Sequence, residues 1–306
     1  MDLFACGGTI RKMMRVAILG DIHGNLPALE AVIADLGPLA PDLVIVDGDI
    51  VNRGPQSREC VQAIQAQGWL AVYGNHEDYV LAFDEGRAPY EWYSDWWLPV
   101  RRVAEELSAD EMAYLRALPR YYVLREPGLP AIRIVHGSPR ALNDGLGFWM
   151  TDEELCAAIG CVPEPVVVGA HTHRPFDRRV APRWALNCGA VGAPYNGDPA
   201  AQYLLLTSRD AAWEADFRGV PYDRAPLYVA WDRAGYMEHV IAQVFRYEIE
   251  TATYHLESYL EFCQARSLDR DALSSFEQYR RASWNVTPGR SLRLPLEQQP
   301  DSPAQP

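Results

Sequence analysis

Five short apolar runs in this chain each end in residues whose side chains can bind a metal ion. The runs RVAILG, DLVIV, WLAVY, AIRIV and PVVVG are rich in β-branched residues, as buried strands are. Helical patterns alternate with such runs from residue 15 onward, which indicates an α/β core. The residues that follow the five runs are, in chain order, Asp21 and His23, then Asp49, then Asn75 and His76, then His136, and finally His171 and His173.

We expect these residues to converge at one rim of the fold. In open α/β sheets ligands bind beyond the carboxyl ends of the strands, where residues distant in sequence can meet. The chain has 7 histidines, and five of them follow these runs. Turn preferences explain a single Asp or Gly after a strand, but they do not explain this concentration of imidazoles. The pattern therefore predicts a metal site.

The composition argues against several classes of partner. A chain of 306 residues with 48% hydrophobic content can bury a large core. Lys and Arg number 28 against 41 Asp and Glu, so the net charge of -13 disfavours duplex nucleic acid and anionic membranes. We see no apolar stretch typical of a signal peptide or a membrane span, and 6 cysteines without paired metal-ligand spacing. We expect a cytoplasmic protein with reduced thiols.

The strand-end motifs resemble those of a known family. GDIHGN, GDIVNRGP, GNHED, HG and GAHTH are similar, in order and spacing, to motifs of the calcineurin-like metallophosphoesterase superfamily. Within it, DIHGNLPALEAV, HGSPR and NCGAVGAPYNGDP look most like the bacterial phosphodiesterase branch. The resemblance spans roughly residues 15–207. It implies an α/β (α+β) fold, a four-layer sandwich of two facing β-sheets flanked by helices, with a two-metal site at one end.

The resemblance also implies the metal ligands. It assigns two overlapping sets, Asp21, His23, Asp49 and His173 for one ion, and Asp49, Asn75, His136 and His171 for the other. Asp49 would bridge the ions, because two close cations repel unless an anion lies between them. This mixture of carboxylate, amide and imidazole suits two divalent or trivalent transition metal ions, Mn, Fe, Zn or Co, and disfavours Ca or Mg.

Residues beside these ligands would act on the substrate. His76 matches the family's catalytic histidine and would protonate the leaving alkoxide, while a metal-bound hydroxide held with the help of Asp49 attacks phosphorus. Arg53 matches an arginine that binds phosphate in protein serine/threonine phosphatases, and Asn75 and His76 would also border the phosphate. The alternatives are a helix cap for His76 and a surface salt bridge for Arg53.

Two positions depart from the family pattern. Protein phosphatases usually have an aspartate at the position of Asn52. An amide can orient an imidazole but stabilises its cation less well, which weakens a protein-phosphatase interpretation. Cys188 stands where a proline is common, and we favour a packed, unreactive cysteine over one that makes the enzyme sensitive to oxidation.

The motifs divide the chain into unequal parts. We expect an N-terminal extension at 1–14 and a catalytic domain at 15–220, with a helical cap inserted at about 83–119. A helical C-terminal extension at 221–290 and a Pro- and Gln-rich, disordered tail at 291–306 would follow. The cap contains an aromatic group, Tyr90, Trp92, Tyr93, Trp96 and Trp97. These rings could stack on a nucleobase, but we favour packing of the cap onto the core.

The C-terminal extension carries an apolar stripe at helical spacing, formed by Ile241, Phe245, Ile249, Ala252, Leu256, Tyr259 and Cys263. Residues 237–266 are predicted to form one long or broken helix, and 269–284 a second helix with Ser267 as its cap. The stripe could pack on the catalytic core, which we favour, or on a second copy of the chain in a homo-oligomer.

Taken together, the sequence predicts a metal-dependent phosphodiesterase or phosphomonoesterase. Its substrate would be a small phosphate ester, with a nucleotide as one candidate, and neither a membrane nor duplex nucleic acid would be a partner. One alternative is a protein serine/threonine phosphatase. Another is a non-catalytic scaffold, like the retromer subunit that resembles this fold and lacks the catalytic histidine; the presence of His76 argues against it.

Overall fold

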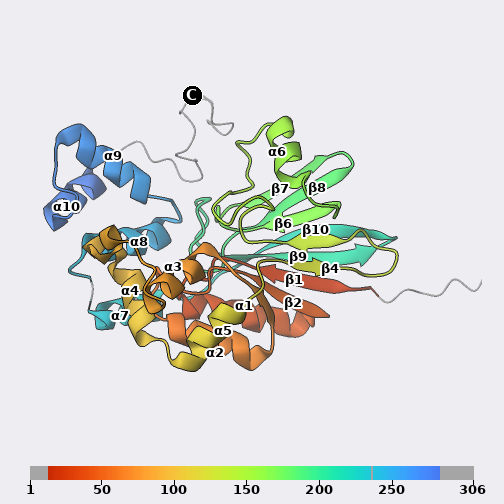
Figure 1. Cartoon of the computed structure of the whole chain (residues 1–306), viewed down its shortest axis with the longest axis horizontal. Coiled ribbons are helices and arrows are strands. Elements are labelled where there is room, and N and C mark those ends of the chain that lie inside the picture. Colours follow the sequence, from red (N-terminus) through yellow and green to blue (C-terminus); the bar gives the residue numbers. More distant parts are fainter. Residues whose placement is uncertain (1–12, 236, 283–306) are drawn as a thin grey trace, which may run out of the picture.

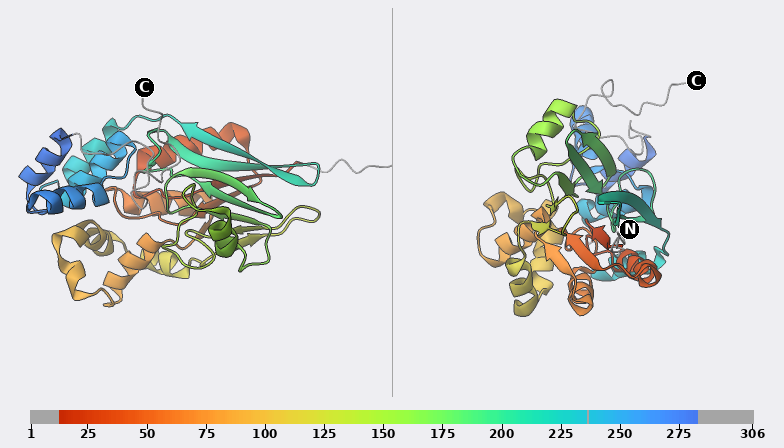
Figure 2. Two further views of the ribbon diagram at one scale, coloured as in Figure 1. Left: turned by 90° about the horizontal axis from the view of Figure 1, so that it is seen from above. Right: turned by 90° about the vertical axis from the view of Figure 1, so that its right-hand side faces the viewer.

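The computed structural model of the protein describes residues 13–235 and 237–282. Within these ranges the chain forms two five-stranded sheets that face each other, with helices on their outer sides (Figures 1 and 2). The predicted fold class is therefore confirmed. The tail expected at 291–306, and most of the extension expected at 1–14, lie outside the described residues.

The two sheets contain parallel and antiparallel strands. The first has the order β10-β9-β1-β2-β3 and the second the order β4-β5-β6-β8-β7. Strands β1, β2 and β3 are parallel, and so are β5, β6 and β8, so each group has its carboxyl ends at one edge of its sheet. The strands are β1 (Arg15–Leu19), β2 (Leu43–Asp47), β3 (Leu70–Val72), β4 (Tyr122–Leu124), β5 (Ile132–Ile134), β6 (Val166–Gly169), β7 (Pro175–Val180), β8 (Arg183–Cys188), β9 (Ala201–Arg209) and β10 (Ala212–Val220).

Helices cover the outer faces of the sheets and gather at one end of them (Figure 1). The α-helices are α1 (Leu26–Leu39), α2 (Ser57–Gln67), α3 (Asn75–Asp84), α4 (Leu98–Glu106), α5 (Ala109–Ala117), α6 (Asp152–Ile159), α7 (Ala225–Ala234), α8 (Val240–Thr251), α9 (Leu256–Arg266) and α10 (Leu273–Arg281). Two short 3-10 helices, η1 (Tyr90–Tyr93) and η2 (Asp95–Trp97), precede α4.

Alternation of side chains along the central strands produces the four layers. On β1, Ala17 and Leu19 face outward and pack with residues of α1 and α2. Val16 and Ile18 face inward and pack against the second sheet through residues such as Val168. The outer face of that second sheet packs on α6. Because both faces of β1 are buried, the strand reads as a continuous apolar run rather than an alternating one.

The predicted cap segment contains η1, η2, α4 and α5. Apolar residues of α4 and α5, among them Val103 and Leu115, belong to the same core cluster as Val80 of α3. The two cap helices therefore pack onto the core through α3. None of the helices in the described part of the chain has the length and apolar character that a membrane span needs.

The C-terminal extension folds back onto the chain that precedes it. Its predicted helix is broken into α8 and α9, and α8 packs through Phe245 and Ile249 against Leu98 of the cap and Tyr195. The stripe is thus buried within the chain. The prediction for the following helix was wrong at its start: Ser267 ends α9 with a φ of 53°, and α10 begins only at 273, because residues 267–272 form turns instead.

Candidate active site

The loops after β1, β2, β3, β5 and β6 bring the expected ligands together. Three overlapping groups of side chains have ligand atoms within 4.8 Å of one another. They are Asp21 with His23 and His173; His23 with Asp49 and His76; and Asp49 with His136 and His171. All belong to one site, buried except for the partly exposed His171, although the first and last of these residues are about 150 positions apart in the sequence.

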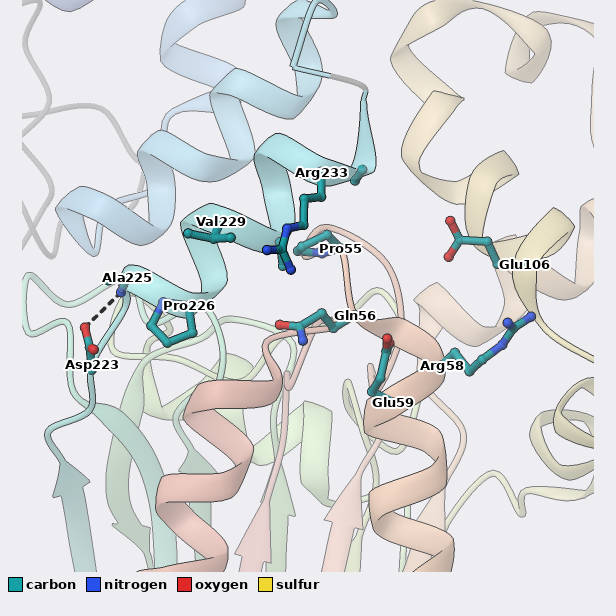
Figure 3. A pocket seen from close by; sticks show the side chains of 12 residues that line it. Pro55, Gln56, Arg58, Glu59, Glu106, Asp223, Ala225, Pro226, Val229 and Arg233 are labelled. Carbon is teal, nitrogen blue, oxygen red and sulfur yellow. Dashed lines mark hydrogen bonds between the residues drawn. The ribbon is translucent and has the colours of Figure 1, made fainter.

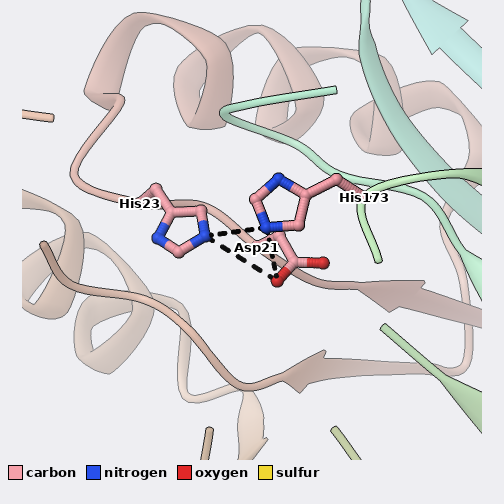
Figure 4. Close-up of side chains that lie close together, drawn as sticks. All are labelled: Asp21, His23 and His173. Carbon is pink, nitrogen blue, oxygen red and sulfur yellow. Dashed lines mark hydrogen bonds and ion pairs between the residues drawn. The ribbon is translucent and has the colours of Figure 1, made fainter. Parts of the chain in front are cut away.

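The first cluster consists of Asp21, His23 and His173 (Figure 4). Nε2 of His23 lies 3.1 Å from Nε2 of His173. Oδ1 of Asp21 lies 3.4 Å from Nε2 of His173 and 3.8 Å from Nε2 of His23. Three ligand atoms from the loops after β1 and β6 therefore point toward a common space.

The second cluster lies on the other side of Asp49. Oδ1 of Asn75 is 3.0 Å from Nε2 of His136 and 2.9 Å from Nδ1 of His171. Oδ2 of Asp49 is 3.2 Å from Nε2 of His136 and 3.7 Å from Nε2 of His23. The Asp49 carboxylate thus faces both clusters.

The surrounding hydrogen bonds favour metal binding over self-contained packing. Nδ1 of His136 contacts the backbone oxygen of Asp47 at 2.7 Å, and Nδ1 of His173 contacts that of Ala193 at 2.5 Å. A ring that donates from Nδ1 presents a lone pair at Nε2, as metal-binding histidines do. Both carboxylate oxygens of Asp21 are buried and have no hydrogen-bond partner. Buried acceptors without partners facing imidazole nitrogens fit a cation between them.

The backbone of these loops adopts an unusual conformation. Asp21, His23, Asp49, His171 and His173 all have φ between 52° and 64°. Residues other than glycine rarely adopt positive φ, and such strain collects at functional sites. The chain therefore turns directly after each strand, and these turns direct the side chains toward the site.

Glu77 fastens the loop after β2 to the start of α3. Its Oε2 accepts hydrogen bonds from the N–H groups of Asp49 and Gly74, both at 2.8 Å, and its Oε1 accepts from that of Ile50 at 2.8 Å. At Gly74 a Cβ would lie 2.3 Å from Oδ1 of Asp49, so only glycine allows this approach. The N–H of His76 donates to the same Oδ1 at 2.8 Å, which fixes the Asp49 carboxylate.

His76 borders the ligands, with its Nε2 3.9 Å from Oδ2 of Asp49. The side-chain amide of Asn52 donates to Nδ1 of His76 at 2.6 Å. Accepting at Nδ1 puts the proton of the neutral ring on Nε2, on the side of the ligand cluster. Burial lowers the pKa of His76 to about 4, and the charge of Arg53 acts in the same direction.

The buried charges influence one another strongly. Burial disfavours the cation of His136, but the carboxylates of Asp49, Asp21 and Asp47 raise its pKa well above the usual value. Burial likewise disfavours a charged Asp49, yet His136 and His76 hold its pKa well below the usual range. Asp49 thus carries its negative charge beside positive partners, and bound metal ions would stabilise that charge in the same way.

Arg53 lies in the loop after β2, as Asp49 does, and its side chain is 11% exposed. Its Nη1 donates to the hydroxyl of Tyr195 and to Oε2 of Glu248, both at 2.6 Å. The alternative of a surface salt bridge is wrong: Arg53 forms an ion pair, but its partner Glu248 is buried in α8. Burial opposes the charge of Arg53, but Tyr195 and Glu248 raise its pKa.

Sequence reasoning missed four residues of this region, Asp47, Glu77, Tyr195 and Glu248. Tyr195 stacks on the ring of His173, with centroids 4.3 Å apart and planes at 6°. Asp47 is fully buried, both of its oxygens lack hydrogen-bond partners, and burial raises its pKa to about 7. A charged residue on a buried helix face was the available signal for Glu248, which lies between Phe245 and Ile249 of the apolar stripe.

Cys188 lies at the end of β8, fully buried beside β1. A Cβ at Gly20 would lie 2.9 Å from its sulfur, so the thiol fills the space that the glycine leaves. Burial raises the pKa of the thiol well above its usual value. A buried, protonated thiol is a poor nucleophile, which agrees with the packed cysteine that we favoured.

A separate cavity of about 870 Å³ lies between α2 and α7 (Figure 3). Its wall carries both signs of charge, from Arg58, Glu59, Glu106, Asp223 and Arg233. Arg58 is already paired with Glu111 at 3.4 Å. This mixed wall contains none of the expected site residues, so the buried cluster, and not this cavity, is the candidate reaction centre.

Comparison with known proteins agrees with the geometry. A family model described as calcineurin-like phosphoesterase matches residues 14–175, more than half of the chain. A solved metallophosphoesterase from Sphaerobacter thermophilus has 25% sequence identity and a TM-score of 0.64, and the match covers 79% of this chain and 100% of that one. An uncharacterised protein of Methanocaldococcus jannaschii is 22% identical over 229 residues, 70% of this chain and 90% of the relative.

Several relatives have a named activity, and each is matched over less than half of its length. A symmetrical bis(5'-nucleosyl)-tetraphosphatase of Thioalkalivibrio sulfidiphilus is 36% identical over 77 residues, which are 24% of this chain and 28% of that protein. The family uses divalent metals, and the His/Asp clusters of this chain could bind them. With the family model matched and these clusters assembled at the strand ends, the chain belongs to the calcineurin-like phosphoesterase family and is a metal-dependent phosphoric ester hydrolase.

Proposed function

We propose that the protein hydrolyses a phosphodiester or phosphomonoester of a small molecule, with a nucleotide as the favoured class, at a centre of two transition metal ions. The observation that carries the proposal is the position of Asp49, whose Oδ2 lies 3.7 Å from Nε2 of His23 and 3.2 Å from Nε2 of His136. A carboxylate that faces two sets of ligands is suited to bridge two cations.

The ligand sets are those that the motifs suggest. Asp21, His23, Asp49 and His173 would hold one ion, and the second would be held by Asp49, Asn75, His136 and His171. When bound, the ions would supply Lewis acidity to the phosphoryl oxygens and increase the acidity of a water. Their mixed nitrogen and oxygen ligands favour Mn, Fe, Zn or Co.

Two residues would complete the chemistry. His76 is the proposed proton donor to the leaving oxygen, because Asn52 holds its Nδ1 while its Nε2 lies 3.9 Å from Oδ2 of Asp49. As an imidazolium the ring would give up its Nε2 proton and become neutral. Arg53 is the proposed phosphate-binding residue. Its Nη1 donates to the hydroxyl of Tyr195, whose ring stacks on that of His173, so its guanidinium is close to the centre.

An aromatic row beside His76 supports a nucleotide substrate. The ring of Tyr79 lies 5.3 Å from that of His76 and 5.4 Å from that of Trp92, which stacks on Trp97 at 4.0 Å. Trp92 and Trp97 are partly exposed, so a base attached to a bound phosphate could reach their edge. The named activity of the tetraphosphatase relative is of this substrate class.

The test is hydrolysis of bis(p-nitrophenyl) phosphate by protein loaded with Mn²⁺. We expect activity in the wild type and its loss in His76→Ala and in Asp49→Ala. Activity retained in both variants would refute the proposal. Comparing kcat/KM for dinucleoside polyphosphates with kcat/KM for phosphopeptides then separates a nucleotide hydrolase from a protein phosphatase. A metal-loaded wild type inert toward every ester would point to a scaffold.

A further inference from the structure

We propose that Glu248, in the C-terminal extension, is a positioning residue that holds Arg53 for phosphate binding, so that the extension forms part of the active site. The inference rests on the proposed function of the site and adds a residue to it. Glu248 lies on α8, 195 positions from Arg53, and outside the segment that carries the ligand motifs.

The carboxylate of Glu248 is itself fixed by the backbone. It is 1% exposed. Its Oε1 accepts hydrogen bonds from the N–H groups of His255 at 2.9 Å and Leu256 at 3.0 Å, where the chain turns from α8 into α9. Its Oε2 accepts from Nη1 of Arg53 at 2.6 Å and from the hydroxyl of Tyr195 at 3.0 Å. Because four donors bind its carboxylate, Glu248 is held in place. It therefore positions Arg53 and does not compete with the substrate for it.

The same helix also contacts the face of the guanidinium. Cζ of Arg53 lies 4.7 Å from the ring centre of Phe245, one turn before Glu248 on α8. An arginine side chain is long and has many rotamers, and each contact restricts it. Ion pair and ring contact together hold Arg53 in one orientation before any substrate arrives.

Donors remain on Arg53 after these contacts are made. A guanidinium has five N–H donors. Tyr195 and Glu248 use those of Nη1, whereas Nε is buried and has no hydrogen-bond partner. A phosphate oxygen is the kind of acceptor that would satisfy such donors, because guanidinium binds phosphate with parallel hydrogen bonds. Glu248 would thus bind Nη1 of Arg53 and leave the other N–H groups of the guanidinium for the substrate.

The experiment compares Glu248→Gln with Glu250→Gln in full-length protein loaded with Mn²⁺. Glu250 is a matched control, because it lies on the same helix and its carboxylate pairs with Arg246 at 3.4 Å and Arg280 at 3.9 Å, not with Arg53. Inorganic phosphate is the probe, and its dissociation constant is measured by titration calorimetry. We expect about tenfold weaker phosphate binding in Glu248→Gln, the loss of roughly one charge-assisted interaction, and no change in Glu250→Gln.

Kinetics and a double mutant separate positioning from a general effect on folding. In Glu248→Gln the KM should rise about tenfold while kcat stays within about threefold. In an Arg53→Ala background, Glu248→Gln should weaken phosphate binding no further. Phosphate binding by Glu248→Gln that equals or exceeds that of the wild type would overturn the inference, and so would an undiminished effect in the Arg53→Ala background.

A second variant keeps the test decisive if Glu248→Gln does not fold. Glu248→Asp keeps a carboxylate for the backbone N–H groups but is too short to reach Arg53 as well, so the same criteria apply to it. Failure of the proposed function is a different result. Wild-type protein that binds phosphate but hydrolyses no ester would reject the hydrolase, while the phosphate affinities of the variants would still decide the role of Glu248.

Discussion

The side-chain amide of Asn52 donates a hydrogen bond to Nδ1 of His76 at 2.6 Å, and this contact sets the tautomer of the proposed proton donor. Asn52 is buried, and its backbone has a φ of 69°. An amide orients the imidazole without adding charge. Burial lowers the pKa of His76 to about 4, and an anionic phosphate bound beside the ring would raise it.

Replacing Asn52 tests this arrangement. In Asn52→Asp the new carboxylate would favour the imidazolium, so the pKa of His76 should rise and the protonated form should persist to higher pH. In Asn52→Leu the ring loses its partner, and kcat should fall by about 10-fold to 100-fold with little change in KM. NMR titration of the histidine rings measures the first effect, and steady-state kinetics measures the second. An unchanged pKa in Asn52→Asp would contradict the proposed contact.

Glu77 is predicted to be essential for the loop that carries Asp49. In Glu77→Gln an amide group would face backbone N–H groups that now donate to a carboxylate, at a cost of about 3 kcal/mol or more. We expect lower thermal stability and less bound metal, measured by calorimetry and elemental analysis. Glu59→Gln on the exposed face of α2 is the control. Full metal content and wild-type stability in Glu77→Gln would show that the loop does not depend on this carboxylate.

Removing metal should destabilise the protein as well as inactivate it. Chelation would leave the buried carboxylates of Asp21 and Asp49 facing each other without a cation. Ligand at 100 times its dissociation constant stabilises a protein by about 2.7 kcal/mol, so the melting temperature should fall on chelation and recover with Mn²⁺ but not with Ca²⁺. In Asp49→Ala the recovery should be much smaller. Identical melting curves for wild-type protein with and without chelator would argue against a bound metal.

Trp92 is predicted to affect nucleotide substrates selectively. In Trp92→Ala the KM for a dinucleoside tetraphosphate should rise about tenfold, the effect of losing one stacked base, while the KM for p-nitrophenyl phosphate should stay the same. Tyr90→Ala is the control, since Tyr90 lies on the same 3-10 helix with 92% of its surface exposed. The prediction concerns the ratio of the KM values for the two substrates. A general loss of folded protein would not change this ratio. An equal effect on both substrates would assign Trp92 to packing.

His255 gives the C-terminal extension a dependence on pH. Burial lowers the pKa of His255 to about 4, below the value of about 6.5 expected in the unfolded chain. The unfolded state therefore binds more protons between these values, and stability that is complete above pH 6.5 is lost as the pH falls toward 4, by up to about 3 kcal/mol.

The measurement compares wild-type protein with His255→Gln in chemical denaturation at several pH values. Acids with raised pKa values, such as Glu77, change in the opposite direction, so the difference between the two proteins is the relevant quantity. We expect the stability advantage of the wild type to shrink between pH 6.5 and pH 4. Parallel pH dependence in the two proteins would exclude His255 as its source.

Much of the fold and of the cluster could be predicted from local sequence. The apolar runs that became β1, β2, β3, β5 and β6 have the composition of buried strands, and parallel strands bring their carboxyl ends to one edge. The position of α10 could not be predicted as well. Ser267 has a side chain that can cap a helix start, yet tertiary packing turns the chain there with a positive φ.

The sequence by itself therefore determined which strand ends carry Asp21, Asp49 and the histidines, because strand periodicity and motif spacing are local properties. Only the tertiary structure decided that Glu248 meets Arg53 and that Tyr195 stacks on His173. Those contacts depend on how α8 docks beside the site, and docking is set by the combined packing of Leu98, Phe245 and their neighbours. No short stretch of sequence determines this docking, because the hydrophobic effect is not directional and every buried apolar residue contributes to it.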